Sequence, residues 1–351
     1  MASTALELMT AAIDAGASDL HLNPGRPPIG RINGELQPMA ADALDDDAAR
    51  ALVEELCNAD RLAEIERLGT TDFGLAHPSG TRFRVSCMRQ RGRLSAVLRV
   101  IPSELLSFDS IGLPKPVQEL LRRPRGLILV TGPTGSGKST TLATMIDWIN
   151  SGFDRHIVTI EDPIEFYHSH KKGLVTQREI GTDVPDFEEA MRRVLRQDPD
   201  VILLGEMRDL ETISAAITAA ETGHLVFGTL HTTGSARTIN RLIDAYPANQ
   251  QEQVRAQLSA SLVAVVSQVL MPRASGNGRV AGFEVMINNP AIANLIRKNE
   301  ANKIQSTLQT NKRQGMVTLD DYLYDLVRRD TITGRTALDY AQSPADLESR
   351  L

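Results

Sequence analysis

Residues 132–139 read GPTGSGKS and match the phosphate-loop pattern G-x-x-x-x-G-K-[ST]. The β-branched, apolar run GLILVT precedes them at 126–131, and residues 140–149 predict a helix. In this order, glycines let backbone N–H groups turn inward around phosphate oxygens, and the helix N-terminus adds partial positive charge. A glycine-rich turn that matches by chance is the alternative, and the flanking strand and helix argue against it.

This loop predicts a site for a nucleoside triphosphate with Mg²⁺. Lys138 is expected to reach the β- and γ-phosphates, and the Ser139 hydroxyl is expected to coordinate the metal ion. The residues predicted to bind the nucleotide are Gly132, Thr134, Gly135, Ser136, Gly137, Lys138, Ser139 and Thr140.

Apolar runs alternate with helical segments from Gly126 onward. HIVTIED at 156–162, VILLGE at 201–206 and HLVFGTLH at 224–231 each predict a strand. Such alternation is typical of an α/β domain, in which helices cover both faces of a mostly parallel sheet. After about Leu262 the pattern is helical and polar, which predicts a helical C-terminal extension.

The first hundred residues predict a smaller α+β unit. Leu6, Met9 and Ile13 share one helical face, and a single further helix is expected from about Ala48 to Leu68. The Asn-Gly pair at 33–34 predicts a hairpin, because both turn residues need positive φ. Further strands are expected at 72–75, 81–90 and 94–101.

Four prolines interrupt the chain between these two patterns, at positions 102, 114, 116 and 124. Proline fixes φ and interrupts regular structure, so the first part of this stretch predicts a linker. We therefore predict an N-terminal domain over 1–101, a linker over 102–113 and a second domain over 114–351.

Two candidate acidic sites follow predicted strands. Glu206 comes directly after 201–205, at the carboxyl end where open α/β sheets place their ligands, and there it can hold Mg²⁺ or polarise water. A glutamate that caps the next helix is the alternative. In TIEDPIEF, residues 159–166, three carboxylates lie close together, and Pro163 could turn Glu165 toward the phosphates. An acidic surface loop is the alternative there.

His224 and His231 flank the predicted strand between them. Histidines in a nucleotide-binding half can sense the γ-phosphate by donating hydrogen bonds, although a lone histidine is more often structural. Zinc is disfavoured because no cysteine or second close histidine pair completes a set of ligands.

The composition is that of an ordinary globular protein. The 351 residues are 42% hydrophobic and 23% charged, with a net charge of −6 that argues against a nucleic-acid coat. Cys57 and Cys87 are too few for a disulfide framework or a four-cysteine zinc site. The longest apolar stretch, 261–271, is too short to span a membrane, and the acidic N-terminus does not resemble a signal peptide.

Four ordered segments resemble the secretion ATPase superfamily of type II secretion and type IV pilus machines. GPTGSGKST looks like its Walker A motif, TIEDPIEF its Asp box, DPDVILLGEMRD its Walker B motif and AETGHLVFGTLHT its His box. The similarity is closest to the PilT-type pilus retraction ATPases of twitching motility. SDLHL, RINGEL and FRVSCMRQRG also look like that family's N-terminal domain. The resemblance implies a PAS-like N-terminal domain and a RecA-like ATPase domain.

The resemblance also implies roles for individual residues. Glu165 would be the general base, Glu206 would support Mg²⁺, and His224 and His231 would couple nucleotide state to domain position. Family arginines of the N-terminal domain approach the phosphates of ATP. The candidates are Arg82, Arg84 and Arg99, with a solvated basic strand face as the alternative.

A homohexamer is implied, in the cytoplasm, docked on an inner-membrane pilus platform protein without zinc or nucleic acid. The short chain and its two cysteines favour retraction over the longer, zinc-bearing assembly and type II secretion ATPases. One departure leaves an accessory retraction ATPase open. The family's AIRNLIRE-type helix reads AIANLIRK at 291–298, with Ala293 for arginine and Lys298 for glutamate.

Two other functions compete with this interpretation. A nucleic-acid translocase would need basic, stacking-rich surfaces, whereas this chain is acidic and only 4% aromatic. A regulatory subunit without turnover is disfavoured by the presence of Lys138, Glu165 and Glu206.

Overall fold

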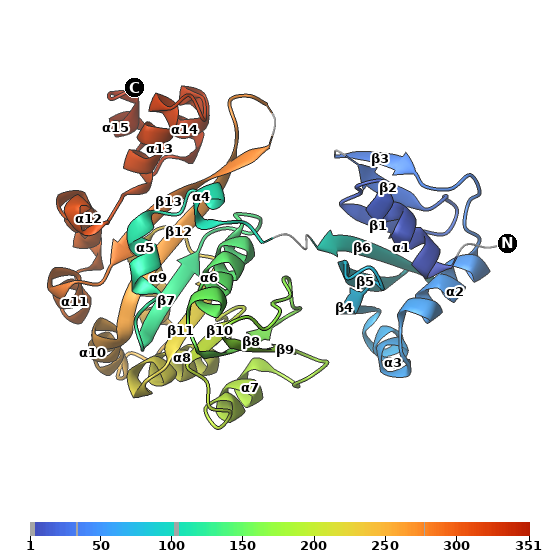
Figure 1. Cartoon of the computed structure of the whole chain (residues 1–351), viewed down its shortest axis with the longest axis horizontal. Helices are drawn as coiled ribbons and strands as arrows, with labels where there is room; N and C mark the ends of the chain where they lie inside the picture. The colour runs from blue at the N-terminus through green and yellow to red at the C-terminus, as the bar shows by residue number, and fades with distance from the viewer. Residues whose placement is uncertain (1–3, 33, 102–104, 277) are drawn as a thin grey trace. The chain divides into compact units, whose positions relative to one another are not determined.

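The computed structural model describes residues 4–32, 34–101, 105–276 and 278–351. The chain divides into two compact units (Figure 1), the first comprising Met1–Glu104 and Glu165–Tyr167, the second Leu105–Ile164 and His168–Leu351. The start of the predicted linker, 102–104, lies outside the described residues, and the boundaries 1–101, 102–113 and 114–351 remain a prediction.

Among its described residues, unit 1 contains a six-stranded antiparallel sheet in the order β3-β2-β1-β6-β5-β4. Its core lies against α1 (Ala5–Asp14), α2 (Asp46–Leu56) and α3 (Ala59–Leu68). The strands are β1 (Asp19–Leu22), β2 (Ile29–Ile32), β3 (Glu35–Pro38), β4 (Thr70–Ala76), β5 (Arg82–Gln90) and β6 (Arg93–Ile101).

Two details of unit 1 differ from the sequence-based expectation. The predicted helix over 48–68 is two helices, because the Asn58 side chain accepts a hydrogen bond from the Arg61 N–H and starts a new helix. In α1 the predicted Met9 is buried and Ile13 packs partly buried against the core, but Leu6 is 44% exposed and Leu8 is buried in its place. The hairpin pairs Ile32 with Glu35, and its Asn33 lies outside the described residues.

Within the described part of unit 2, a seven-stranded sheet has the order β13-β12-β7-β11-β10-β8-β9. All neighbouring pairs are parallel except β12 with β13. The strands are β7 (Gly126–Thr131), β8 (His156–Glu161), β9 (Leu174–Glu179), β10 (Val201–Leu204), β11 (Leu225–Leu230), β12 (Leu262–Pro272) and β13 (Arg279–Ile287).

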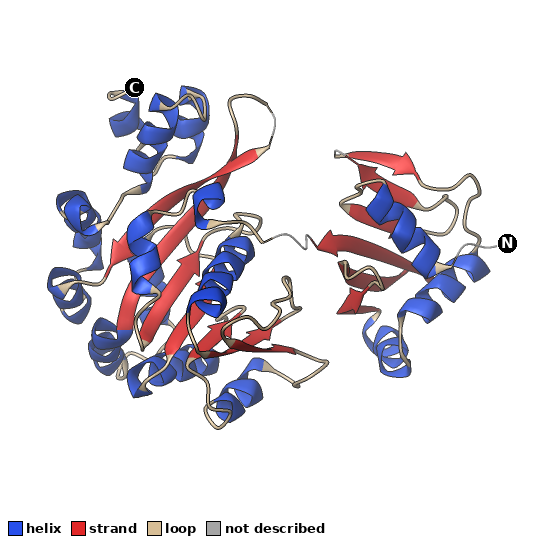
Figure 2. Cartoon of the chain, in the orientation of Figure 1, coloured by secondary structure: helices blue, strands red, loops and turns tan. Residues whose placement is uncertain are grey.

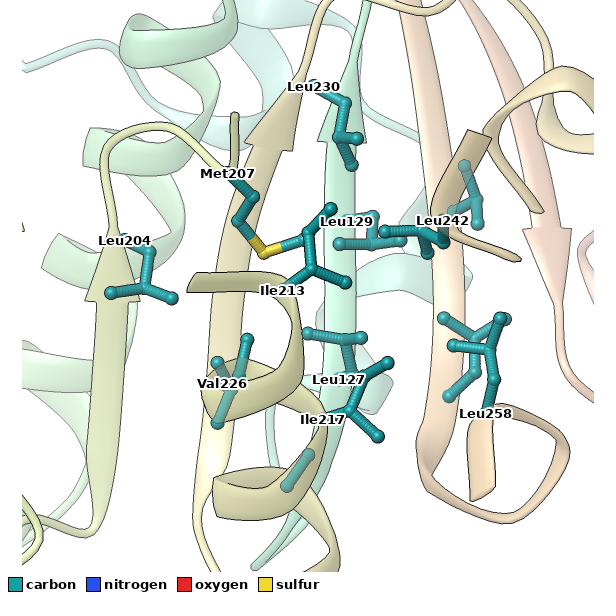
Figure 3. Packing of buried hydrophobic residues seen from close by; sticks show 14 of the residues in the cluster. Leu127, Leu129, Leu204, Met207, Ile213, Ile217, Val226, Leu230, Leu242 and Leu258 are labelled. Carbon is teal, nitrogen blue, oxygen red and sulfur yellow. The ribbon is translucent and has the colours of Figure 1, made fainter. Parts of the chain in front are cut away.

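Helices cover both faces of this sheet (Figure 2). Successive residues of β7 point to opposite sides, so Leu127 and Leu129 pack in one core cluster and Ile128 and Val130 in another. Figure 3 shows the first cluster, where the two leucines lie beside Ile213 and its neighbours. The helices are α4 (Phe108–Ile111), α5 (Lys115–Leu120), α6 (Lys138–Gly152), α7 (Phe187–Val194), α8 (Leu210–Thr222), α9 (Ser235–Asp244) and α10 (Gln251–Ser261).

The segment after Leu262 was predicted to be helical, and this prediction is wrong. Residues 262–272 and 279–287 form the buried antiparallel pair β12 and β13, because the run is rich in β-branched valine and too short for a long buried helix. The helical extension begins later and consists of α11 (Pro290–Arg297), α12 (Ile304–Thr310), α13 (Leu319–Arg328), α14 (Gly334–Tyr340) and α15 (Pro344–Glu348).

The predicted α/β class is confirmed. No helix in the described parts of the chain has the length and apolar character needed to cross a membrane.

Candidate nucleotide site

The phosphate loop connects the end of β7 to the start of α6. Gly132, Gly135 and Gly137 have φ values of 145°, 79° and 88°, which favour glycine over any residue with a Cβ. Gly137 is the N-cap residue of α6, and as a glycine it offers no side chain to the N–H groups of the first turn. These N–H groups and the helix dipole provide an anion site.

Side chains of the loop complete this anion site. The Lys138 ammonium donates hydrogen bonds to the carbonyl oxygens of Gly132 and Pro133, at 2.9 and 3.1 Å, and so lies over the loop. The Ser136 hydroxyl is buried and has no hydrogen-bond partner among the described residues. Ser139 and Thr140 are half-buried in the first turn of α6. A buried hydroxyl, a lysine and the N–H groups of a helix N-terminus fit the phosphates of a nucleotide.

Glu206 lies just past β10, at the same edge of the sheet. One carboxylate oxygen accepts a hydrogen bond from Arg208 at 2.6 Å, and the other lies 2.9 Å from Nε2 of His231. The hydrogen bond from Arg208 lowers the pKa of Glu206. Burial opposes this effect, but the charges of Arg208 and His231 keep the pKa below its ordinary value. The group is therefore a carboxylate near neutral pH.

His231 joins this carboxylate to the phosphate loop. While Nε2 faces Glu206, Nδ1 lies 3.5 Å from the hydroxyl of Thr134. The polar series Thr134–His231–Glu206–Arg208 therefore connects residues of the Walker A, His box and Walker B segments. The structure brings these predicted residues together.

His224 lies at the opposite end of β11. Its ring Nδ1 is 3.0 Å from the carbonyl oxygen of Ala219, and its own carbonyl accepts a hydrogen bond from Gly126, the first residue of β7. Since a strand rises about 3.3 Å per residue, the Cα atoms of the two histidines are about 23 Å apart. The structure does not bring His224 to the phosphate loop.

The Asp-box carboxylates have different surroundings. Glu161 accepts hydrogen bonds from Thr159 and Gln177 at 2.6 and 3.3 Å, within the sheet. Glu165 is half-buried and is grouped with unit 1, after the cis peptide bond between Asp162 and Pro163. Its predicted role as general base remains a prediction.

The predicted arginines lie on β5 and β6 of unit 1. Arg84 is exposed and lies opposite Arg99 in the register, and Arg82 is half-buried. Arg99 donates a 2.9 Å hydrogen bond to Asp19. Burial tends to raise the pKa of Asp19, but hydrogen bonds from Arg99 and Ser18 and the charge of Arg99 outweigh it and lower that pKa. Arg99 is therefore engaged within its own unit.

One residue of the site was missed at the sequence level. Gln268 of β12 is 3% exposed and hydrogen-bonds to both ends of the Ser136–Thr141 segment. The signal for it was an amide that follows Ser267 inside a run of mostly apolar residues.

Comparisons with known proteins identify the family of the chain. Residues 3–331 match the family described as Type II/IV secretion system protein. The chain is 48% identical over 338 residues to "Type IV pilus retractation ATPase PilT" of Pseudomonas aeruginosa, covering 96% of this chain and 98% of that protein. It is 47% identical over 316 residues to a "Twitching motility protein" of Neisseria gonorrhoeae, covering 90% of this chain and 84% of that protein.

A solved structure is also similar over nearly the whole length. The crystal structure of the pilus retraction motor PilT with bound ADP has a TM-score of 0.93 and 46% identity, covering 99% of each chain. The resemblance seen in the four motifs is confirmed. The chain therefore belongs to the type II/IV secretion system protein family, and it is an ATPase.

Proposed function

We propose that this ATPase is a motor of a type IV pilus machine that powers pilus retraction and twitching motility. The observation that carries the proposal is the series Thr134–His231–Glu206–Arg208. It links the phosphate loop to the end of β10 in a chain that is similar, over nearly its full length, to proteins named for pilus retraction and twitching.

The phosphate loop would bind ATP through its backbone. The N–H groups of Gly135 and of Gly137 to Thr140 would donate to the phosphate oxygens, and the Lys138 ammonium would neutralise the β- and γ-phosphates. Because Lys138 already lies on the loop carbonyls, it needs only a small movement to reach a phosphate held there.

We assign Ser139 and Glu206 to Mg²⁺. A hydroxyl and a carboxylate are the oxygen ligands that this ion prefers, directly or through water. Bound Mg²⁺ would neutralise charge that develops on the phosphates. The lowered pKa of Glu206 supports this assignment, because a carboxylate already ionised needs no proton release to serve it.

Glu165 is proposed to accept the proton of the attacking water. The choice of Glu165 rests on its place as the second glutamate of the TIEDPIEF segment. His231 would sense the γ-phosphate through Thr134. His224, which bonds to backbone, would act in coupling to domain position without a part in hydrolysis.

Arg82, Arg84 and Arg99 are proposed to contact the phosphates. For Arg99 this requires exchange of its hydrogen bond to Asp19. Hydrolysis would then change the angle between the domains predicted at 1–101 and 114–351, with 102–113 as hinge. Six such chains would form a ring on an inner-membrane platform protein, on the cytoplasmic side.

Pilus assembly, type II secretion and an accessory retraction role are the alternatives. Ala293 and Lys298 bear on them, since α11 is anchored by the buried Ile292 and Ile296 and exposes Lys298. Ala293 is half-buried within α11 and Lys298 is its exposed C-cap residue, so neither departure replaces a buried anchor of the helix.

A deletion strain separates these functions. Cells that lack the protein should be hyperpiliated and unable to twitch, and wild-type protein but not the Lys138→Ala variant should restore movement. Bald cells would identify an assembly motor instead. Normal twitching after deletion would point to an accessory role, and a secretion defect with normal pili would point to type II secretion.

A further inference from the structure

Gln268 lies beside the phosphate loop although it comes from a distant part of the chain. Strand β12 runs parallel to β7 with Ser267 opposite Thr131, so the following residue is level with the start of the loop. The side chain is 3% exposed, and its partners Ser136 and Thr141 are 2% and 0% exposed. The amide is therefore sealed from solvent behind the loop.

Both ends of this amide are used. Nε2 donates to the carbonyl oxygen of Ser136 at 2.6 Å, and Oε1 accepts from the hydroxyl of Thr141 at 2.7 Å. A carbonyl can only accept, so the Ser136 contact fixes which end of the amide carries the NH₂ group. Gln268 thereby ties the middle of the loop to the first turn of α6.

The contact with Ser136 also orients an N–H group of the loop. In a trans peptide the C=O and the next N–H point in opposite directions. Since the Ser136 carbonyl points to Gln268, the Gly137 N–H points away from it. That N–H is then held on the opposite side of the loop, where α6 begins and the phosphates bind.

Two glycines of the motif make room for this contact. A Cβ at Gly132 would overlap the backbone carbonyl oxygen of Gln268, and a Cβ at Gly137 would lie 2.9 Å from its Nε2. Glycine is therefore needed at 132 and 137 for two reasons. A Cβ there would clash with Gln268 of β12, and both residues have positive φ.

We propose that Gln268 is a positioning residue, which holds the phosphate loop in the conformation that binds the β-phosphate of ADP and ATP. It touches no nucleotide atom and acts through Ser136, Gly137 and Thr141. The proposal needs only nucleotide binding by this ATPase, and it stands whether or not the motor retracts pili.

The test measures nucleotide affinity in three purified variants. Gln268→Met keeps length and apolar packing but removes both hydrogen bonds. Thr141→Val removes only the bond to Oε1. Thr144→Val is the matched control, because Thr144 is also a buried threonine of α6 but donates to the carbonyls of Leu106 and Thr140. ADP with Mg²⁺ is titrated by calorimetry, and the melting temperature of each nucleotide-free variant is recorded.

We expect the Kd of ADP to rise about tenfold in Gln268→Met and about threefold in Thr141→Val, and to stay within about twofold in Thr144→Val. In steady-state assays the KM for ATP should rise more than kcat falls. A Gln268→Met protein that melts earlier but binds ADP like wild type would overturn the proposal, because it would make the role merely structural. If that variant does not fold, equal ADP affinities of Thr141→Val and Thr144→Val would overturn it.

Discussion

The two ends of the parallel sheet of unit 2 place the same residue type in opposite roles. At the carboxyl end of β11, His231 lies between the side chains of Thr134 and Glu206. At the amino end, His224 bonds to the backbone carbonyl of Ala219. The first histidine contacts side chains of the nucleotide site, whereas the second bonds to the backbone away from it.

The glycine loop and Glu206 also lie at the carboxyl end. In parallel sheets this edge carries the strand-to-helix loops, and helix N-termini there attract anions. ATP hydrolysis is therefore expected to depend on residues at the carboxyl edge of the sheet only. Substituting the same residue type at each edge tests this expectation.

The largest difference in ATP hydrolysis is expected between substitutions of two cationic residues, one beyond each end of β7. Lys138→Ala should reduce ATP hydrolysis at least about 100-fold, because it removes the ammonium that stabilises charge on the phosphates. Arg125→Ala, directly before β7 at the amino end, should keep hydrolysis within about twofold of wild type. Phosphate release by the purified proteins measures both, and equal losses would break the contrast between the edges.

A smaller contrast is expected between two glutamates. Glu206→Gln should lower hydrolysis about 10- to 100-fold and raise the Mg²⁺ concentration needed for half-maximal rate, because an oxygen charge near the metal is lost. The control is Glu221→Gln at the end of α8, where Glu221 accepts a hydrogen bond from Gln257. This variant should keep the hydrolysis rate and the Mg²⁺ dependence of wild type. Unchanged Mg²⁺ dependence in Glu206→Gln would remove Glu206 from the metal site.

The smallest effect concerns stability and pH. Arg208 lowers the pKa of Glu206, so the pair stabilises the fold above the unfolded-state pKa of the carboxyl, and this stabilisation is lost as pH falls through the folded-state pKa. Arg208→Ala should therefore lower the free energy of unfolding at pH 7 by less than about 1 kcal/mol, since Arg208 is exposed.

Urea unfolding at pH 7 and near pH 3 measures this difference. We expect the difference between wild type and Arg208→Ala to shrink as pH falls through the folded-state pKa of Glu206, because protonation removes the charge with which Arg208 pairs. A difference that is equal at the two pH values would show that Arg208 stabilises the fold by packing and not by its charge.

Much of the site was predictable because its signals are contiguous. One short, continuous stretch of chain forms the strand, loop and helix around 126–149. Another forms the strand before Glu206. Strand geometry alone also separates His224 from His231, because residues at the two ends of a six-residue strand cannot reach the same phosphate.

Other parts depend on contacts between distant segments. Gln268 reaches Ser136 from 132 positions further along the chain, and only the pairing of β12 with β7 brings them together. The β12 segment itself was misjudged, because a short buried apolar run has no periodicity that separates strand from helix. The break at Asn58 was missed because apolar residues continue across it.

The most direct test of the account compares His231→Ala with His224→Ala in steady-state ATP hydrolysis. We expect kcat to fall about tenfold or more in His231→Ala. In His224→Ala we expect kcat within about twofold of wild type and a loss of about 1 kcal/mol in the free energy of unfolding. Wild-type kcat in His231→Ala, or equal losses in both variants, would contradict the claim that His231 links the phosphate loop to Glu206.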